Sequence, residues 1–531
     1  MSGAPEIYDT TLRDGAQAEG ILFSLDDKIR IAHCLDDLGV HFIEAGGPGM
    51  NPKDTELFRR LAKWRRRRAK VVAFGFTCRP KGDPAADAGL RALLAAKADV
   101  ATLVGKSSAL HVRTVLKTGL EENLRMISES VAYVRKKGLP VFFDAEHFFD
   151  GYAEDPDYAV ETLLAAEAGG AQRLVLCDTN GGMLPDEVGE IVMAVSERVR
   201  TPLGIHAHND GGLAVANSLA ALNAGAVQAH GTINGYGERC GNADLCALLP
   251  ALVVKMGLPS INKENLKKLT RASHFVSEMA NRPHPWNAPY TGRSAFAHKA
   301  GIHVNAIKKE PRTYEHIAPE SVGNLRRVLI SEQSGRANVL HMAEQMGIEL
   351  DDEAAVKSIL RQLKQMEFRG YQFEGAEASF EMLVRKNVGR HKDFFELDGF
   401  RVTVDRRRGR EIFSEATVRL RVLGRVEETV SEGDGPVNAL DNALRKALQR
   451  FYPSLREMRL TDYKVRVLDA DRGTAAKVRV LITSEDGSSV WSTVGVSTNV
   501  IQASWLALVD SIEYKLLKDI GGGKPAKKKS R

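Results

Sequence analysis

Short apolar, β-branched runs alternate with helix-like segments through the first half of the chain. Strands that alternate with helices indicate βαβ units and a parallel sheet. Eight such units over about 250 residues favour a (β/α)8 barrel. An open doubly wound sheet is the alternative, but the first run leads into Leu12–Gly15 (LRDG), which is not a dinucleotide-binding glycine loop. The eight runs are Ile7–Thr11, Val40–Ala45, Val71–Phe76, Val100–Gly105, Val141–Glu146, Leu174–Thr179, Leu203–Asn209 and Ala226–Ile233.

The pattern changes twice after the barrel. We predict four domains: a catalytic barrel over 1–275, helical linker subdomains over 276–399, an α+β regulatory domain over 400–519 and a disordered basic tail over 520–531. The third domain reads as a weak internal repeat, because two strand-rich halves are each followed by a helix. Those helices are expected at Val437–Gln449 and Val500–Leu517.

Composition narrows the class of protein. With 43% hydrophobic and 27% charged residues, the chain is predicted to be globular. We find neither an apolar run long enough to cross a bilayer nor a secretory signal, so we expect no membrane partner. Five cysteines without a CxxC pair favour reduced thiols and a cytoplasmic location. The net charge of +6 comes mainly from the tail, so no nucleic-acid partner is expected.

Polar residues gather where the predicted strands end. In a barrel these ends form one mouth, which is where active sites lie. We therefore expect an enzyme. The residues concerned are Arg13, Asp14, Glu44, Asp144, Glu146, Asp178–Asn180, His206–Asp210 and Gly235–Asn242.

His206 and His208 give the sharpest local signal. Two residues apart on a strand, they point to the same face, which is the barrel interior. Asp14 adds a carboxylate oxygen and Asn242 an amide oxygen. This mixed set with open positions suits Zn²⁺, Mn²⁺ or Co²⁺. The alternative for the two histidines alone is a hydrogen-bonded core pair, but the set as a whole favours a metal.

Three further residues carry candidate chemistry. Arg13 can bind a carboxylate or stabilise an oxyanion, or form a structural pair with Glu44 or Glu146. Thr179 can donate its hydroxyl to a substrate or simply cap its strand. Glu146 lies among phenylalanines in the sequence, and burial among their rings would raise the pKa of its carboxyl and suit it to proton transfer.

Three motifs of the barrel resemble those of the metal-dependent Claisen-condensing barrel family, which includes 2-isopropylmalate, homocitrate and citramalate synthases and hydroxymethylglutaryl-CoA lyase. Further similarity after the barrel favours a synthase, and the whole most resembles the long-form citramalate synthases. The motifs are Asp9–Gly15, His206–Asp210 and Gly235–Asn242. The further stretches are Ala295–His303, Ser331–Arg336, Gly435–Ala439, Asp144–Tyr152 and Trp491–Ser497.

The resemblance implies condensation of acetyl-CoA with pyruvate to give citramalate and CoA, a step of isoleucine biosynthesis. A divalent metal (Mn²⁺, Zn²⁺, Mg²⁺ or Co²⁺) would be held by Asp14, His206, His208 and Asn242. Arg13 and Thr179 would hold the oxo acid, and Glu146 would assist at its oxo group. His303 would be a base, and Tyr314 would belong to the same site, which the neighbouring subunit completes. A homodimer is therefore expected.

The C-terminal module resembles the amino-acid-sensing domain of the same family. Gly435, Pro436 and Asn438 match its motif, which implies feedback inhibition by isoleucine. The fourth strand departs from the family pattern. It ends in Val104–Ser108 (VGKSS) instead of a threonine-serine pair followed by an aspartate, so no contact to the substrate side chain is carried over there.

Substrate choice is predicted from aromatic residues at the rim. Phe74, Phe76 and Phe143 would fill the space that a larger oxo acid needs, which favours pyruvate, although the rings suit an ordinary core equally. The alternative is a 2-isopropylmalate synthase or another acyltransferase of the family. A more distant alternative is a non-catalytic ligand-sensing or nucleic-acid-binding protein. It would use the basic run Arg65–Arg68, expected late in a helix, and the lysines of the tail.

Overall fold

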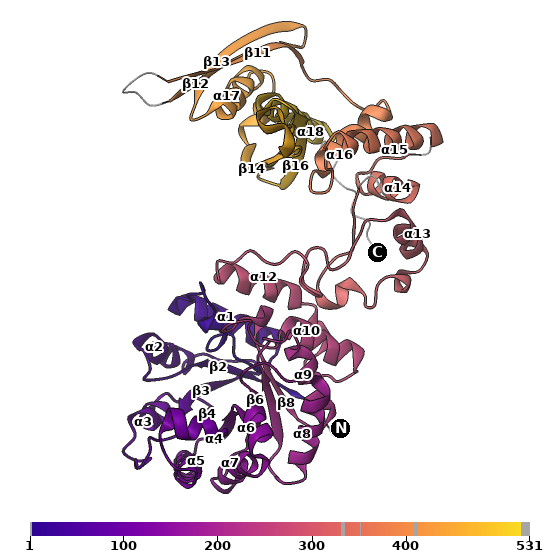
Figure 1. The fold of residues 1–531 in the computed structure, drawn as a ribbon. Helices are drawn as coiled ribbons and strands as arrows, with labels where there is room; N and C mark the ends of the chain where they lie inside the picture. Colours follow the sequence, from indigo (N-terminus) through magenta and orange to yellow (C-terminus); the bar gives the residue numbers. More distant parts are fainter. Residues whose placement is uncertain (1–2, 331–334, 351, 407–411, 522–531) are drawn as a thin grey trace. The chain divides into compact units, whose positions relative to one another are not determined.

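The computed structural model describes residues 3–330, 335–350, 352–406 and 412–521, and it divides into two compact units (Figure 1). Unit 1 comprises Met1–Phe296 and His316–Arg326, and unit 2 comprises Ala297–Glu315 and Arg327–Arg531. No described helix is long and apolar enough to cross a membrane. The predicted tail lies, beyond residue 521, outside the described residues, as does most of the Ser331–Arg336 motif.

Unit 1 is the predicted barrel. Its eight strands are all parallel and follow chain order, and β8 pairs with β1 to close the sheet. The strand expectations are confirmed to within three residues at each end. The strands are β1 (Glu6–Asp9), β2 (Phe42–Gly46), β3 (Lys70–Phe76), β4 (Val100–Lys106), β5 (Val141–Glu146), β6 (Arg173–Asp178), β7 (Leu203–Ala207) and β8 (Gln228–Gly231).

Helices surround the barrel and bury its outer face (Figure 1). Capping residues set several of their starts, because a side-chain oxygen takes an otherwise unpaired amide. Ser24, for example, forms a reciprocal capping box with Asp27 at the start of α1. The helices are α1 (Leu25–Leu38), α2 (Pro52–Leu61), α3 (Ala88–Ala95), α4 (Ala109–His111), α5 (Leu120–Lys136), α6 (Phe148–Glu154), α7 (Pro156–Ala168), α8 (Pro185–Ser196), α9 (Ala214–Asn223), α10 (Leu245–Pro250), α11 (Lys263–Leu266) and α12 (Leu269–Met279).

The lumen of the barrel is packed at its amino-terminal end. Tyr8, Phe42, Val72, Val100 and Phe142 form a separate buried cluster there. These residues alternate along their strands with side chains that face the helices, as the two-residue period of a strand requires. The polar residues that come later in the strands therefore lie nearer the carboxyl-terminal mouth.

The basic run Arg65–Arg68 does not lie in a helix, so that expectation is wrong. Helix α2 ends at Leu61, and the run forms the connection to β3. The cause is the buried Asp36, whose carboxylate accepts two backbone amides of the run at 2.8 and 2.9 Å. Side chains of the run pair with Asp37 and Asp99. Much of its charge is therefore compensated within the barrel unit.

Unit 2 begins with helical segments. Strands β9 (Ala297–His298) and β10 (Arg327–Val328) form a two-stranded parallel ladder, which joins the two chain segments of unit 2. A small core of Val339, Ile359, Phe373 and other apolar residues lies among the helices that follow. These helices are α13 (Gly301–Lys309), α14 (Arg336–Gln345), α15 (Glu353–Phe368) and α16 (Glu377–Asn387).

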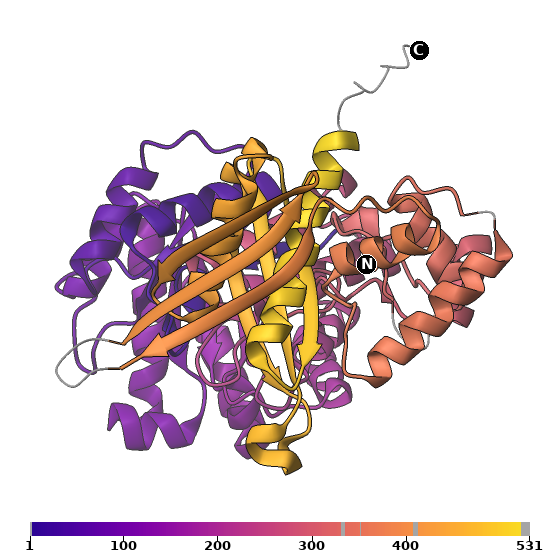
Figure 2. The same cartoon turned by 90° about the horizontal axis from the view of Figure 1, so that it is seen from above.

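The rest of unit 2 confirms the predicted internal repeat. Each half is a three-stranded antiparallel sheet followed by one helix, and the two halves share one apolar core. In Figure 2 the orange strands of the first half lie side by side, and α18 of the second half is yellow. The halves consist of β11 (Glu396–Asp405), β12 (Phe413–Val422), β13 (Arg425–Gly433) and α17 (Pro436–Leu448), then β14 (Arg459–Val467), β15 (Val478–Asp486), β16 (Ser489–Ser497) and α18 (Val500–Gly521).

Candidate active site at the mouth of the barrel

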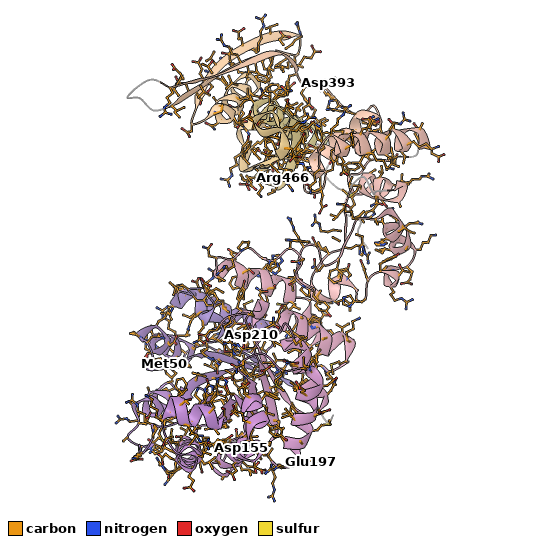
Figure 3. All side chains as sticks on the ribbon, viewed as in Figure 1. Met50, Asp155, Glu197, Asp210, Asp393 and Arg466 are labelled. Carbon is orange, nitrogen blue, oxygen red and sulfur yellow. The ribbon has the colours of Figure 1, made fainter. Side chains whose placement is uncertain are left out.

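A cavity of about 440 Å³ opens at the carboxyl-terminal end of the strands. Figure 3 labels two residues near this cavity, Met50 and Asp210. Met50 follows β2 and lines the cavity. Asp210 follows β7 and pairs with Arg239, which also lines the cavity. Six of the predicted site residues line this one cavity, although they come from four different strands or the loops after them. They are Arg13, Asp14, Glu146, Thr179, His206 and His208.

Three of these residues form a group that can hold a metal ion. One ligand atom from each of Asp14, His206 and His208 lies within 4.8 Å of the others, and all three residues are buried. The Oδ2 atom of Asp14 is 3.5 Å from Nε2 of His206 and 3.9 Å from Nε2 of His208. These separations suit atoms that share a cation between them.

Asn242 completes the group. An isolated antiparallel β-bridge pairs the backbone of His208 with that of Asn242. It connects the loop after β8 to the end of β7. The Nδ2 atom of Asn242 donates to Asp14 Oδ1 at 3.0 Å and to the carbonyl of Tyr236 at 3.1 Å. Its Oδ1 atom is buried and has no hydrogen-bond partner among the described residues. Because an unpaired buried acceptor is costly, this oxygen fits the role of a metal ligand.

The charge states of the group also suit a cation. Burial opposes ionisation of Asp14, but the guanidinium of Arg13 and the imidazole of His206 hold the pKa of that carboxyl well below its usual range. Burial, with His206 nearby, lowers the pKa of His208 to about 4. At neutral pH the carboxylate is ionised and the His208 ring is neutral, which are the forms that bind metals.

Arg13 is fixed from two sides. Its Nε donates to Glu44 at 2.6 Å, its Nη1 donates to Asp14 at 2.9 Å, and its guanidinium lies 4.1 Å above the centre of the Phe74 ring. Glu44 is fully buried and also accepts from the hydroxyls of Tyr8 and Thr10, both at 2.7 Å. Of the two pairings proposed for Arg13 from the sequence, the structure forms the one with Glu44.

Thr179 offers a hydroxyl to the cavity. Its Oγ1 accepts the backbone amide of His147 at 2.8 Å, and its carbonyl accepts from Arg239 at 2.7 Å. The residue is therefore held in place while its hydroxyl hydrogen stays available. His147 itself has a left-handed backbone with φ of 58°, which turns the chain sharply after β5.

Glu146 does not lie in an aromatic pocket, so that expectation is wrong. A quarter of its side chain is exposed, and its carboxylate pairs with Lys106, not with Arg13. The neighbouring rings of Phe148 and Phe149 are packed in the outer core, on the other side of the strand ends. Its carboxylate nevertheless faces the cavity.

Phe143 does not line the cavity, so its predicted substrate contact is corrected. The residue is fully buried in the outer core, and its ring lies next to Gly105 and Ile127 of α5. The cause is strand alternation, because Phe142 and Asp144 face the lumen and Phe143 must then face the helices. Phe74 and Phe76 do line the cavity.

His303 and Tyr314 lie in unit 2. His303 is on α13, and its ring is 4.1 Å from that of Tyr314, with an angle of 31° between the planes. Tyr314 is 46% exposed. The two rings thus form one accessible pair, and their part in the barrel site stays a prediction.

The three predicted regulatory residues lie at the start of α17. Gly435 precedes the helix, Pro436 is its first residue, and Asn438 accepts the amide of Asp434 at 3.2 Å. Asn438 also lines a cavity of about 460 Å³ between α17 and β14, together with Arg445. This cavity offers both polar and apolar groups.

Two functional candidates inside the barrel were given no role from the sequence: His230 was not singled out, and Asp144 was named only as a residue of the mouth. His230 is fully buried on β8, its Nδ1 lies 3.4 Å from Nδ1 of His206, and its Nε2 contacts Gln228 at 3.0 Å. Asp144 is buried against the cavity with one oxygen unpaired, and burial, with Glu44 nearby, raises its pKa to about 7. Period-two alternation along β8 would have pointed to His230, because it shares a face with Gln228.

Comparison with known families accounts for nearly the whole chain. The HMGL-like family matches residues 4–276, the homocitrate synthase post-HMGL domain-like family matches 290–370, and the LeuA allosteric (dimerisation) domain matches 374–516. The chain therefore belongs to the HMGL-like family, a metal-dependent family of enzymes that here carries a LeuA-type C-terminal domain.

Three curated relatives are similar over almost their full lengths, and all three are named (R)-citramalate synthase. The protein of Geobacter sulfurreducens is 53% identical over 98% of this chain and 99% of its own. That of Aquifex aeolicus is 54% identical over 97% and 98%, respectively. That of Synechocystis sp. is 52% identical over 96% of both chains.

Proposed function

We propose that this protein condenses acetyl-CoA with pyruvate and hydrolyses the thioester, so that acetyl-CoA, pyruvate and water give citramalate and CoA. The observation that carries the proposal is the buried group of Asp14, His206 and His208 beside the fixed guanidinium of Arg13 in one cavity. Relatives at more than 50% identity that carry the name of this activity support it.

A divalent metal ion fits the group. Asp14, His206, His208 and Asn242 would hold it, and this mixed nitrogen and oxygen set suits Mn²⁺, Zn²⁺ or Co²⁺, with Mg²⁺ as a further candidate. When bound, such an ion supplies Lewis-acid polarisation of a 2-oxo acid.

The residues of the cavity account for binding of the oxo acid. Arg13 carries a fixed positive charge into the cavity, and Thr179 keeps a hydroxyl hydrogen to donate. Together they can hold the carboxylate of pyruvate. Phe74 and Phe76 narrow the cavity, which favours a methyl group over the larger side chain of 2-oxoisovalerate.

Proton transfer is assigned to residues of both units. A base, for which we propose His303 with Tyr314 beside it, removes a proton from the acetyl methyl group. The enolate oxygen that results carries negative charge, which Arg13 can stabilise. After attack on the oxo carbon, the new alkoxide receives a proton from Glu146 or through a water held by it. Water then cleaves the thioester and releases CoA.

Assembly and regulation follow from the C-terminal domain. The LeuA allosteric (dimerisation) domain indicates a dimer that is regulated. We propose that the base of one subunit serves the barrel of the other, and that isoleucine is the inhibitor, bound near Gly435, Pro436 and Asn438. The five cysteines are all free, which supports a reducing compartment, and we propose the cytoplasm.

A CoA-release assay tests the proposal. With manganese present, CoA release should require both acetyl-CoA and pyruvate and should match the citramalate formed. A chelator should stop it, and Arg13→Ala should lower kcat/KM about a hundredfold or more. Release with 2-oxoisovalerate should be at least about tenfold less efficient. A preference for 2-oxoisovalerate would instead identify a 2-isopropylmalate synthase, and CoA release without any oxo acid would refute a condensing enzyme.

A further inference from the structure

Lys106 is the last residue of β4. In the ladder of β4 and β5, Lys106 is directly opposite Glu146. Both residues share a strand face with residues two positions earlier, Val104 and Asp144, which line the cavity. The Nζ atom of Lys106 forms an ion pair with the carboxylate of Glu146.

The backbone around this pair is rigid. The carbonyl of Lys106 accepts from Nδ2 of the fully buried Asn123 at 2.8 Å, and the amide of Ser107 donates to the carbonyl of Glu146 at 3.0 Å. The side chains of Lys106 and Glu146 are only 19% and 25% exposed. Because both ends of the pair start from fixed points, the ion pair selects one orientation of the Glu146 carboxylate.

The two partners have unequal access to the cavity. Glu146 is among the described residues that line it, and Lys106 is not. Lys106 therefore contacts the carboxylate without itself lining the space where substrate binds. We expect it to act on the reaction through Glu146.

The charges around the cavity explain what the ion pair between Lys106 and Glu146 contributes. The cavity already contains the carboxyl groups of Asp14 and Asp144, and it must accept an anionic oxo acid. A further unpaired carboxylate at Glu146 would repel that substrate and turn toward solvent. The ammonium of Lys106 compensates its charge and keeps it directed at the reacting centre.

We infer that Lys106 is a positioning residue that orients the carboxylate of Glu146 toward the water through which a proton reaches the oxo group. The inference rests on the role proposed above for Glu146. Lys106 itself exchanges no proton with substrate, and its contribution is orientation and charge.

A double-mutant cycle tests the inference. Lys106→Met, Glu146→Gln and the double variant are compared in the full-length, manganese-loaded protein by CoA release. We expect Lys106→Met to lower kcat about tenfold to a hundredfold while KM for acetyl-CoA changes less than about twofold. The double variant should lose no more than Glu146→Gln alone, because both changes remove the same function. Lys106→Arg should recover much of the loss.

The matched control is Lys267→Met, which removes an exposed lysine paired with Glu264 outside the cavity. It should leave kcat unchanged. Circular dichroism and manganese content verify that each variant is folded, and Lys106→Gln replaces Lys106→Met if the latter fails this check.

Different failures have different meanings. If Glu146→Gln lowers kcat and Lys106→Met does not, the inference is wrong and the proposed function stands. If the losses of the two single variants multiply in the double variant, Lys106 acts independently of Glu146 and the inference is also wrong. If Glu146→Gln is as active as the wild type, the proposed role of Glu146 fails, and the inference fails with it.

Discussion

Among the described residues, two groups of three side chains combine imidazole and carboxylate ligand atoms that lie within 4.8 Å of one another. One is Asp14, His206 and His208 in the barrel, and the other is His391, Asp393 and Glu513 in unit 2. The barrel group is buried throughout, whereas the Asp393 side chain, labelled in Figure 3, is 80% exposed. Proximity alone does not distinguish them.

Support from surrounding residues does distinguish them. In the barrel, Asp14 accepts from Arg13 and Asn242, and His206 is backed by His230. Second contacts of this kind orient metal ligands and tune their charge. We therefore expect a metal centre in the barrel and no comparable one in unit 2.

The unit 2 group lacks such support. Glu513 has no hydrogen bond among the described residues, and Nε2 of His391 lies 3.7 Å from its carboxylate. That nitrogen already contacts Asp393 at 3.0 Å. Burial raises the pKa of Glu513 to about 7, although Lys386 opposes this increase. We interpret the group as a buried carboxyl beside a largely buried histidine.

The largest effect should separate the two groups directly. His206→Ala should abolish manganese binding and lower kcat/KM at least about a hundredfold. The group then lacks one metal ligand, and the reaction lacks the ion that would polarise the oxo acid. His391→Ala is the matched control and should change neither. Manganese per chain, measured by mass spectrometry after dialysis, and CoA release provide the readouts. Equal loss of metal in both variants would contradict the comparison.

Removal of support should have a smaller effect than removal of a ligand. His230→Phe keeps an aromatic ring against Tyr8 but deletes the nitrogen that faces His206. We expect manganese affinity to fall about tenfold to a hundredfold. His274→Phe, which replaces an imidazole stacked on His284 elsewhere in the barrel unit with a phenyl ring, is the control. Unchanged affinity in the His230 variant would show that the backing contact is dispensable.

Glu513 allows a test by pH. Its folded-state pKa of about 7 lies above the ordinary value of 4.5, so the native state binds the proton more tightly. Its contribution to stability is fully present below pH 4.5 and is lost as the pH rises through 7. Glu513→Gln should therefore stabilise α18 by about 2 kcal/mol at pH 8 and by little at pH 5. Hydrogen exchange of α18 peptides measures this difference. Equal stabilisation at both pH values would exclude titration of Glu513 as the cause.

The smallest effect should come from Asp393. Because its side chain is exposed, Asp393→Asn should change the stability of unit 2 by less than about 0.5 kcal/mol and leave metal content unaltered. The same hydrogen-exchange and dialysis measurements apply. Loss of a bound ion in this variant alone would identify unit 2 as a second metal centre.

Sequence periodicity predicted the barrel and most of its mouth, because strand ends and same-face spacing are local properties. His206 and His208 could be paired on that basis alone. Phe143 was misassigned because the alternation that sets Asp144 toward the lumen was not applied to its neighbour. Lys106 was left without a role, because its pairing with Glu146 depends on the register of two strands.

Long-range contacts explain the remaining differences. The path of the chain after α2 is set by Asp36, which accepts the backbone amides of Arg67 and Arg68 from about thirty positions away in the chain. Glu146 was expected among rings because phenylalanines adjoin it in the sequence, yet its carboxylate pairs with a residue of the preceding strand. Neither contact is encoded in local composition.

The carboxylate of Glu44 receives donors from Tyr8, Thr10 and Arg13, and so leaves the guanidinium almost no freedom to reorient. An arginine immobilised before substrate arrives incurs little reorganisation energy when charge develops on the enolate. Lysine in its place would have a single ammonium to divide among Glu44, Asp14 and the substrate. Even this charge-conserving exchange at residue 13 should therefore be nearly as damaging as truncation.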